Sequence, residues 1–231
     1  MHIAGIVKTS LLDYPGKISA VIFTQGCNYN CFYCHNRALI EPVRTDVTTQ
    51  TSGDISAFLH SRIGKLDGIV LSGGEPTLHK SIGVFLSQIK DMGYAVKIDT
   101  NGSNPDCIET LLSRGLVDYI ALDVKAPYAR YNEITGALPI GIEQTLTLLR
   151  AYACQYEVRT TYIPQLNNDD IATIARTITP VPLYILQPYR IPELYLPDDA
   201  DRVNTMPHNN QALEEAAAAA RGYVDNVRVR G

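Results

Sequence analysis

The sequence predicts an α/β fold built on a largely parallel sheet. Apolar runs alternate along the chain with segments whose apolar residues recur at helical spacing. The apolar runs are continuous rather than alternating, as in strands that are covered on both faces. About six strand–helix units follow one another, which favours parallel strands joined by right-handed crossovers. This pattern fits both a barrel and an open doubly wound sheet.

The expected strands are short apolar runs that end near glycine, proline or a polar residue. They cover residues 3–8, 18–24, 68–72, 95–100, 119–124, 156–163 and 183–186. A turn over 9–17 follows the first run, because the Asp-Tyr-Pro-Gly sequence at 13–16 supplies a proline that presets the bend and a glycine that allows positive φ. A short strand is also expected near the end of the chain, over 226–230.

The expected helices carry apolar residues at helical spacing. They cover residues 54–63, 82–92, 105–113, 140–153, 169–177 and 210–221. Gly93 and Gly115 are natural stops for two of them, and Asn168 is a suitable N-cap for the helix that begins at 169. Residues 37–52 are polar, and no regular element is expected there.

Length and composition indicate one domain of 231 residues, with a core over about 18–190 and a C-terminal extension over about 191–231. The formal charge of −4 argues against a general binder of nucleic acid or membrane surfaces. No apolar run approaches the roughly 18 residues that a membrane span needs. The N-terminus shows no signal peptide, so we expect a cytoplasmic protein with reduced thiols.

The main candidate for a metal site is a loop in which Cys27, Cys31 and Cys34 fall within eight residues, directly after the apolar run at 21–24. Thiolates this close together can reach one metal centre with little loss of loop entropy. Such soft ligands select zinc, copper(I) or an iron–sulfur cluster. On a four-iron cluster, three protein ligands would leave one iron open, and an open position is what metal catalysis requires.

Other interpretations of these cysteines are a zinc knuckle with His35 as fourth ligand, haem attachment through the C-x-x-C-H sequence at 31–35, and a disulfide. Adjacent residues make poor ligands for one tetrahedral ion, haem attachment belongs to exported proteins, and a reducing compartment disfavours a disulfide. Cys107 and Cys154 stand alone, and we expect both to be small buried core residues.

The spacing C-x3-C-x2-C, with the aromatic Tyr33 before the last cysteine, resembles the signature of the radical SAM superfamily. The resemblance implies one [4Fe–4S] cluster on Cys27, Cys31 and Cys34, with S-adenosylmethionine at the open iron and Tyr33 beside the cofactor. Reductive cleavage of the sulfonium then gives a 5′-deoxyadenosyl radical. Residues 35–72 hold no cysteine, so no second cluster is expected.

The superfamily's fold is a partial (β/α)6 TIM-like barrel, with its chemistry on the loops that follow the strands. After the run at 68–72, residues Gly73, Gly74 and Glu75 resemble the GGE motif of the superfamily. The resemblance implies that this backbone, together with Glu75, contacts the amino group of S-adenosylmethionine. An ordinary glycine-rich turn between strand and helix is the alternative.

Polar residues also follow the next two strands, where a buried carboxylate is costly unless it is paired or binds a metal. They are Asp99, Thr100, Asn101, Asp123 and Lys125. They resemble the D-T-N-G and D-x-K elements of glycyl-radical enzyme activases, which implies a place beside S-adenosylmethionine that can take a monovalent cation. The alternative is that Asp99 caps a turn while Asp123 pairs with Lys125 or Arg130.

The last two strands carry further candidates. Residues 160–164 are expected to border the site. Gln187 is expected to hydrogen-bond the adenine or ribose of the cofactor, and Arg190 to hold a carboxylate or a partner chain.

Residues 8–17, 23–27 and 34–36 are most similar to the activating proteins of anaerobic ribonucleoside-triphosphate reductase. This similarity implies a glycyl radical formed on a partner reductase and a flavodoxin or ferredoxin-type electron donor. The alternatives are a radical SAM enzyme for another glycyl-radical enzyme of the formate-lyase type, one acting on a small molecule, or a non-enzymatic interaction module stabilised by zinc.

Overall fold

The computed structural model describes residues 1–40 and 52–230, and in them eight strands form one sheet. The strands are β1 (Ile3–Ser10), β2 (Ser19–Thr24), β3 (Gly68–Gly73), β4 (Ala95–Thr100), β5 (Tyr119–Asp123), β6 (Gln155–Tyr162), β7 (Tyr184–Pro188) and β8 (Val227–Val229). β1 is antiparallel to β2, and every later neighbouring pair is parallel. The predicted parallel sheet is confirmed.

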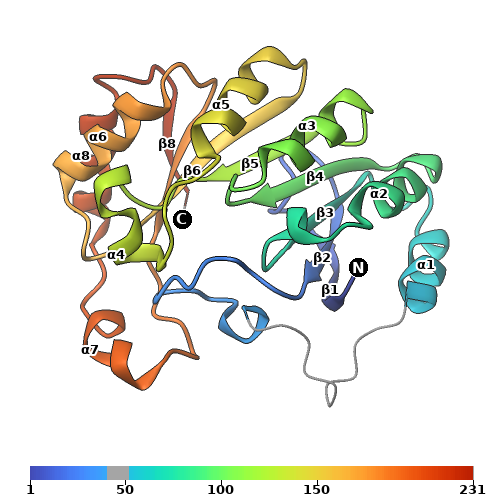
Figure 1. The fold of residues 1–231 in the computed structure, drawn as a ribbon, viewed down its shortest axis with the longest axis horizontal. Helices are drawn as coiled ribbons and strands as arrows, with labels where there is room; N and C mark the ends of the chain where they lie inside the picture. Colours follow the sequence, from blue (N-terminus) through green and yellow to red (C-terminus); the bar gives the residue numbers. More distant parts are fainter. Residues whose placement is uncertain (41–51, 231) are drawn as a thin grey trace.

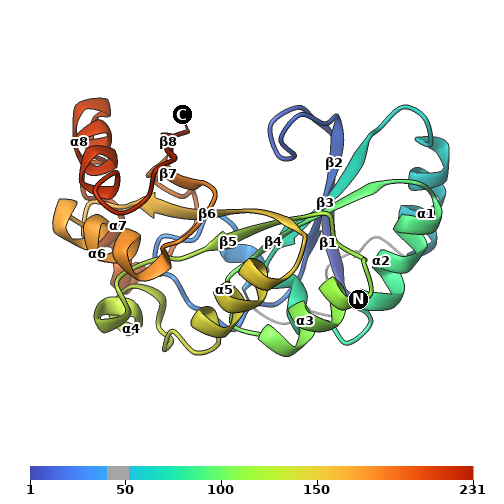
Figure 2. The same cartoon turned by 90° about the horizontal axis from the view of Figure 1, so that it is seen from above.

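The spatial order of the strands equals their order in the chain. A doubly wound sheet reverses direction partway across, whereas a barrel runs on in one direction. The architecture is therefore a partial barrel, with β1 and β8 as its edges among the described residues. Figures 1 and 2 show the curved sheet, with the helices that follow its strands on the outer side.

The helices are α1 (Ser52–Ser61), α2 (Ile82–Asp91), α3 (Pro105–Ser113), α4 (Tyr131–Thr135), α5 (Ile142–Ala151), α6 (Asn168–Ile178), α7 (Ala200–Val203) and α8 (Asn210–Ala220). The six expected helices are present, while α4 and α7 are additional single-turn helices. The N-cap of α6 is Asn167 rather than Asn168: its side chain accepts from Asp170 N at 2.9 Å and so completes a capping box. Within the polar segment at 37–52, where no regular element was expected, Arg37–Leu39 forms a short 3-10 helix. The expectation for residues 41–51 lies outside the described residues.

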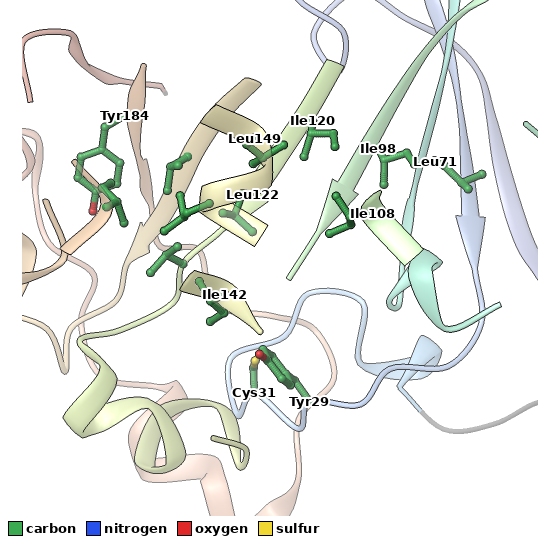
Figure 3. Close-up of a cluster of buried hydrophobic side chains, with 14 of the residues drawn as sticks. Tyr29, Cys31, Leu71, Ile98, Ile108, Ile120, Leu122, Ile142, Leu149 and Tyr184 are labelled. Carbon is green, nitrogen blue, oxygen red and sulfur yellow. The ribbon is translucent and has the colours of Figure 1, made fainter. Parts of the chain in front are cut away.

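The main core lies between the outer face of the sheet and the helices. In Figure 3, Leu71, Ile98 and Ile120 of successive strands lie near Ile108 of α3 and Leu149 of α5. These side chains are at most 1% exposed. Continuous apolar strands are needed because the inner face of the sheet also buries side chains.

The inner face has its own small core at the amino-terminal ends of the strands. Tyr14 of the turn before β2 packs there with Val21, Val70 and Tyr119. Gly68 makes room for it, because a Cβ at this position would lie 3.0 Å from the Tyr14 ring and 2.9 Å from a backbone oxygen. The predicted turn therefore packs over the inner face at the amino-terminal ends of these strands.

The segment after residue 190 joins the same sheet and packs on the same layer of helices. α8 packs on α6, and β8 pairs with β7. Arg230 reaches inward to Glu157, which is fully buried, with N–O distances of 3.1 and 3.3 Å. Glu157 also accepts a hydrogen bond of 2.8 Å from Tyr119. The division at about 190 into core and extension stays a prediction.

The described residues contain no helix that is both long enough and apolar enough to cross a membrane.

Replacing Arg230 with methionine should lower the free energy of unfolding by about 1–3 kcal/mol, because the buried Glu157 carboxylate would lose its closest cationic partner. Urea unfolding of the protein measures this loss. Arg228→Met is the matched control, since this exposed neighbour on β8 donates only to Asn226 among the described residues. Equal losses in the two variants would contradict a structural role for the Glu157 pair.

Candidate functional site

A cavity of about 470 Å³ lies at the carboxyl-terminal ends of the strands. Its lining includes every residue predicted for the cluster or the cofactor. These are Cys27, Cys31, Tyr33, Cys34, Gly73, Gly74, Glu75, Asp99, Thr100, Asn101, Asp123, Lys125 and Gln187. Thr161 also lines the cavity, whereas Arg190 and the other four residues at 160–164 are absent from its described lining. The structure thus gathers the candidates in one place, while their individual roles remain predictions.

The cysteine loop crosses this end of the barrel between β2 and the short 3-10 helix Arg37–Leu39 (Figure 1). Backbone hydrogen bonds hold both of its sides: Cys27 N donates to Ile40 O at 3.1 Å and Asn30 N donates to Thr135 O at 2.8 Å. Tyr29, next to Cys31 in Figure 3, anchors the loop in the core and is 3% exposed. The loop is therefore a fixed part of the fold.

The three thiols differ in exposure: Cys31 is buried, whereas Cys27 and Cys34 are half-buried. Burial raises the pKa of Cys31 to about 12 and raises the pKa of the other two thiols as well. Metal binding would therefore have to displace three protons. No three His, Cys, Asp or Glu side chains in the described residues are gathered around a point where one metal ion could sit.

Two buried tyrosine hydroxyls on the cysteine loop support a site that is completed by a bound group. Tyr29 and Tyr33 line the cavity, and within the described chain neither hydroxyl has a hydrogen-bond partner. Buried polar atoms are rarely left unpaired. The Tyr33 ring is held edge-on between Phe32 and Tyr189, at centroid distances of 5.2 and 6.4 Å. Cysteine ligands, unpaired hydroxyls and a polar cavity together fit a [4Fe–4S] cluster and a polar cofactor.

The paired glycines allow one loop to pack against another. A Cβ on Gly74 would lie 2.0 Å from Gly26 O, and a Cβ on Gly73, which has φ of 107°, would lie 2.5 Å from Thr24 N. The sequence suggested that glycine lets the backbone approach a ligand. In the structure, the absent side chains allow the turn after β3 to contact the end of β2 and the start of the cysteine loop. Both glycines also line the cavity, and their predicted contact with the cofactor stays a prediction.

Glu75 has its carboxylate directed at neighbouring backbone and hydroxyl groups. One oxygen accepts from Thr77 N, Thr77 Oγ1 and Thr100 Oγ1 at 3.1, 2.6 and 2.8 Å. The other accepts from Asn101 N at 2.7 Å. Burial raises the pKa of Glu75, and these bonds oppose that rise. Glu75 therefore joins the ends of β3 and β4, while its predicted contact with the amino group stays a prediction.

Asp99 and Asp123 do lie at neighbouring strand ends, and Arg159 of β6 bridges them. Arg159 Nε donates to Asp123 at 2.8 Å and Nη1 donates to Asp99 at 3.3 Å. Asp99 also pairs with the buried Lys97 at 2.5 Å, and Asp123 with Lys125 at 3.4 Å. The alternative of a partner for Asp123 was right for Lys125 and wrong for Arg130, which pairs with Glu133 and Asp170.

Sequence reasoning missed Lys97, Glu157 and Arg159, although a signal was present. Residues 157, 159 and 161 of β6 are polar at every second position of a strand, so they share one face. That face is the inner one, since Arg159 and Thr161 line the cavity while Val158 and Tyr162 belong to the main core. When the other strands of a sheet are continuously apolar, polar residues at every second position of one strand indicate side chains that point into the barrel.

Cys107 and Cys154 lie outside the cavity lining, in accordance with their separation in the sequence. The expectation that both are buried core residues was too strong, because both are half-buried and pack against the edge of the main core.

Gly74→Ala should destabilise the protein by about 2 kcal/mol or more, because the new Cβ would collide with Gly26 O, a backbone atom that cannot rotate away. Urea unfolding measures the change. Gly5→Ala is the control, since a Cβ there meets nothing within 4 Å. A Gly74→Ala protein as stable as the Gly5→Ala protein would show that the two loops do not need this contact.

Lowering the pH should destabilise the folded protein, because it protonates the Asp123 carboxylate. Burial alone would raise its pKa, but Arg159 and Lys125 outweigh burial and lower the pKa to about 2. A carboxyl whose pKa is lower in the folded state stabilises above its unfolded value and loses that contribution as the pH falls toward the folded value. The free energy of unfolding should therefore decrease between about pH 5 and pH 2.

Asp123→Asn should reduce this pH slope, measured by urea unfolding at a series of pH values. The exposed substitution Asp225→Asn serves as control. An unchanged slope in the Asp123 variant would mean that the ion pairs do not persist in solution.

Comparison with known proteins agrees with this geometry. The family model of the Radical SAM superfamily matches residues 21–178. A Methanocaldococcus jannaschii protein named "Putative glycyl-radical enzyme activating enzyme" is 38% identical over 99% of this chain and 95% of its own length. The pyruvate formate-lyase-activating enzyme of Clostridium pasteurianum is 27% identical over 81% of this chain and 82% of its own.

Solved structures share the fold at low sequence identity. Streptococcus suis SuiB bound to S-adenosylmethionine has a TM-score of 0.71 at 16% identity, over 91% of this chain and 50% of SuiB. TYW1 with a lysine-pyruvate adduct bound has a TM-score of 0.56 at 15% identity, over 90% and 73% of the two chains. The chain therefore belongs to the radical SAM superfamily, in the group of glycyl-radical enzyme activating enzymes.

Proposed function

We propose that this protein generates a glycyl radical on an anaerobic ribonucleoside-triphosphate reductase, using one [4Fe–4S] cluster and S-adenosylmethionine. The observation that carries the proposal is the single cavity lined by the three cysteines, the Gly-Gly-Glu turn and two strand-end aspartates. When bound, the cluster and cofactor supply an electron and a carbon-centred radical that takes a hydrogen atom from glycine. A flavodoxin or ferredoxin-type protein is the proposed electron donor.

The chain itself holds and isolates the reacting groups. Cys27, Cys31 and Cys34 would bind the cluster on a loop fixed by backbone hydrogen bonds. Lys125 keeps its charge, because Asp123 raises its pKa despite the opposing effect of burial. A charged amine beside the cavity suits the carboxylate of S-adenosylmethionine. The apolar packing of Tyr14 on the inner face excludes water from the amino-terminal ends of the strands.

The choice of reductase as target rests on residues 8–17, whose sequence resembles the reductase activating proteins. Asp13 of this segment lines the same cavity as the cysteines, so the segment borders the proposed site of hydrogen removal. Its neighbours Leu11 and Leu12 are 70% and 85% exposed and are available to a partner chain. These positions support recognition of the target by the turn before β2.

A second candidate target is an enzyme of the formate-lyase type. The similarity to the Clostridium pasteurianum activating enzyme, which spans 81% of this chain, favours it. Both candidates share the same site chemistry, so only the partner separates them.

The decisive experiment mixes the anaerobically reconstituted protein with S-adenosylmethionine, a reductant and each candidate partner in turn. Electron paramagnetic resonance should show a glycyl-radical doublet with the ribonucleotide reductase. A doublet with the formate-lyase enzyme alone would favour the second candidate target.

Metal analysis should find four irons and four sulfides per chain. One zinc per chain with no iron would contradict both candidate functions.

Replacing Cys27, Cys31 or Cys34 singly with alanine should abolish cofactor cleavage while leaving the fold largely intact. Cleavage is followed as 5′-deoxyadenosine release by chromatography, and folding by circular dichroism. Cys107→Ala and Cys154→Ala are the matched controls and should cleave at the normal rate, since neither residue lines the cavity. Retained cleavage in all three loop variants would remove those cysteines from the mechanism.

A further inference from the structure

The resemblance to activases allows a monovalent metal cation between the strand-end aspartates, but the residues of this chain do not fit one. All four carboxylate oxygens of Asp99 and Asp123 already accept from side chains. On Asp99, Oδ1 accepts from Lys97 and Arg159, and Oδ2 accepts from Ser72 at 3.0 Å. On Asp123, Oδ1 accepts from Arg159 and Oδ2 from Lys125. A hard cation takes oxygen ligands and would have to compete with these donors and lie beside their positive charges.

Charged partners already surround the two aspartates. Three cations, those of Lys97, Lys125 and Arg159, face the carboxylates of Asp99 and Asp123. Glu75 lines the same cavity, and its carboxylate is compensated by backbone and hydroxyl donors rather than by a cation. A metal ion between the aspartates would lie beside three positive charges, whereas a carboxylate of a ligand would be attracted to them.

Arg159 is placed to supply the positive charge that a metal ion would bring to this site. Its side chain is 10% exposed, it lines the cavity, and it lies between the two aspartates. Nε and Nη1 are used by the carboxylates, and Nη2 makes no hydrogen bond with the described residues. A planar guanidinium held on one side by carboxylates can donate to a further carboxylate from its free side.

We propose that Arg159 replaces a metal cation in this site: it bridges Asp99 and Asp123 and donates to a carboxylate group of the bound cofactor. Arg159 is then a cofactor-binding residue, and the enzyme needs no specific sodium or potassium ion. The cofactor part of this inference rests on the proposed use of S-adenosylmethionine, whereas the bridge does not.

The first test compares the wild-type enzyme in potassium, sodium and tetramethylammonium chloride at one fixed ionic strength. Calorimetric titration of the reconstituted enzyme with S-adenosylmethionine should give dissociation constants that agree within about twofold. The thermal unfolding midpoint without cofactor should be the same in the three salts. A saturable gain of about tenfold in affinity with potassium or sodium would overturn the proposal.

The second test uses Arg159→Gln. Affinity for S-adenosylmethionine should fall about tenfold or more, as expected for the loss of one charged hydrogen bond. Potassium or sodium should now raise the unfolding midpoint above that in tetramethylammonium, because two carboxylates have lost their shared partner. Arg176→Gln, an exposed change on α6, is the matched control and should behave as wild type.

An Arg159→Gln protein that binds the cofactor normally and remains indifferent to the salts would overturn the proposal. If this variant does not fold, Arg159→Lys and the wild-type salt series still decide the question. Neither measurement needs a glycyl-radical partner. A wrong target enzyme would leave both results unchanged, so the two proposals fail separately.

Discussion

The site depends on the close contact between the turn after β3 and the start of the cysteine loop. Glu75 N donates to Gly26 O at 2.8 Å, and the Glu75 carboxylate accepts from residues at the end of β4. One residue thereby connects the ends of three neighbouring strands. Only glycine at position 74 permits this approach, so the placement of the cysteines relative to the strand-end carboxylates follows from a backbone contact.

The site also depends on the charged groups of the inner face and on their pairing. An interior lined with Lys97, Glu157 and Arg159 is costly to desolvate, and each of these charges is compensated by a partner of opposite sign. Arg230 of β8 completes this compensation from the end of the chain. The sheet therefore carries hydrocarbon on its outer face and a paired ionic lining on the inner face beside the cavity.

The sequence predicted the alternating elements, the parallel sheet and the gathering of polar residues at strand ends, because these follow from local periodicity and from the geometry of parallel strands. The convergence of the cysteine loop with Gln187 came only from resemblance. The bridge from Arg159 to two aspartates could not be predicted, since it depends on which side chains of three strands face inward at one level. The contact of Gly74 with Gly26 was missed for the same reason, since the two residues lie far apart in the sequence.

Tyr14 gives the barrel one further property. Its ring packs among Val21, Val70 and Tyr119, so the inner face of the sheet is apolar at the amino-terminal ends of these strands and charged farther along them. The ion pairs therefore have a nonpolar neighbour on one side, which lowers the local dielectric constant and strengthens their mutual attraction. Hydrocarbon packing and charge pairing are thus coupled on one face of the sheet.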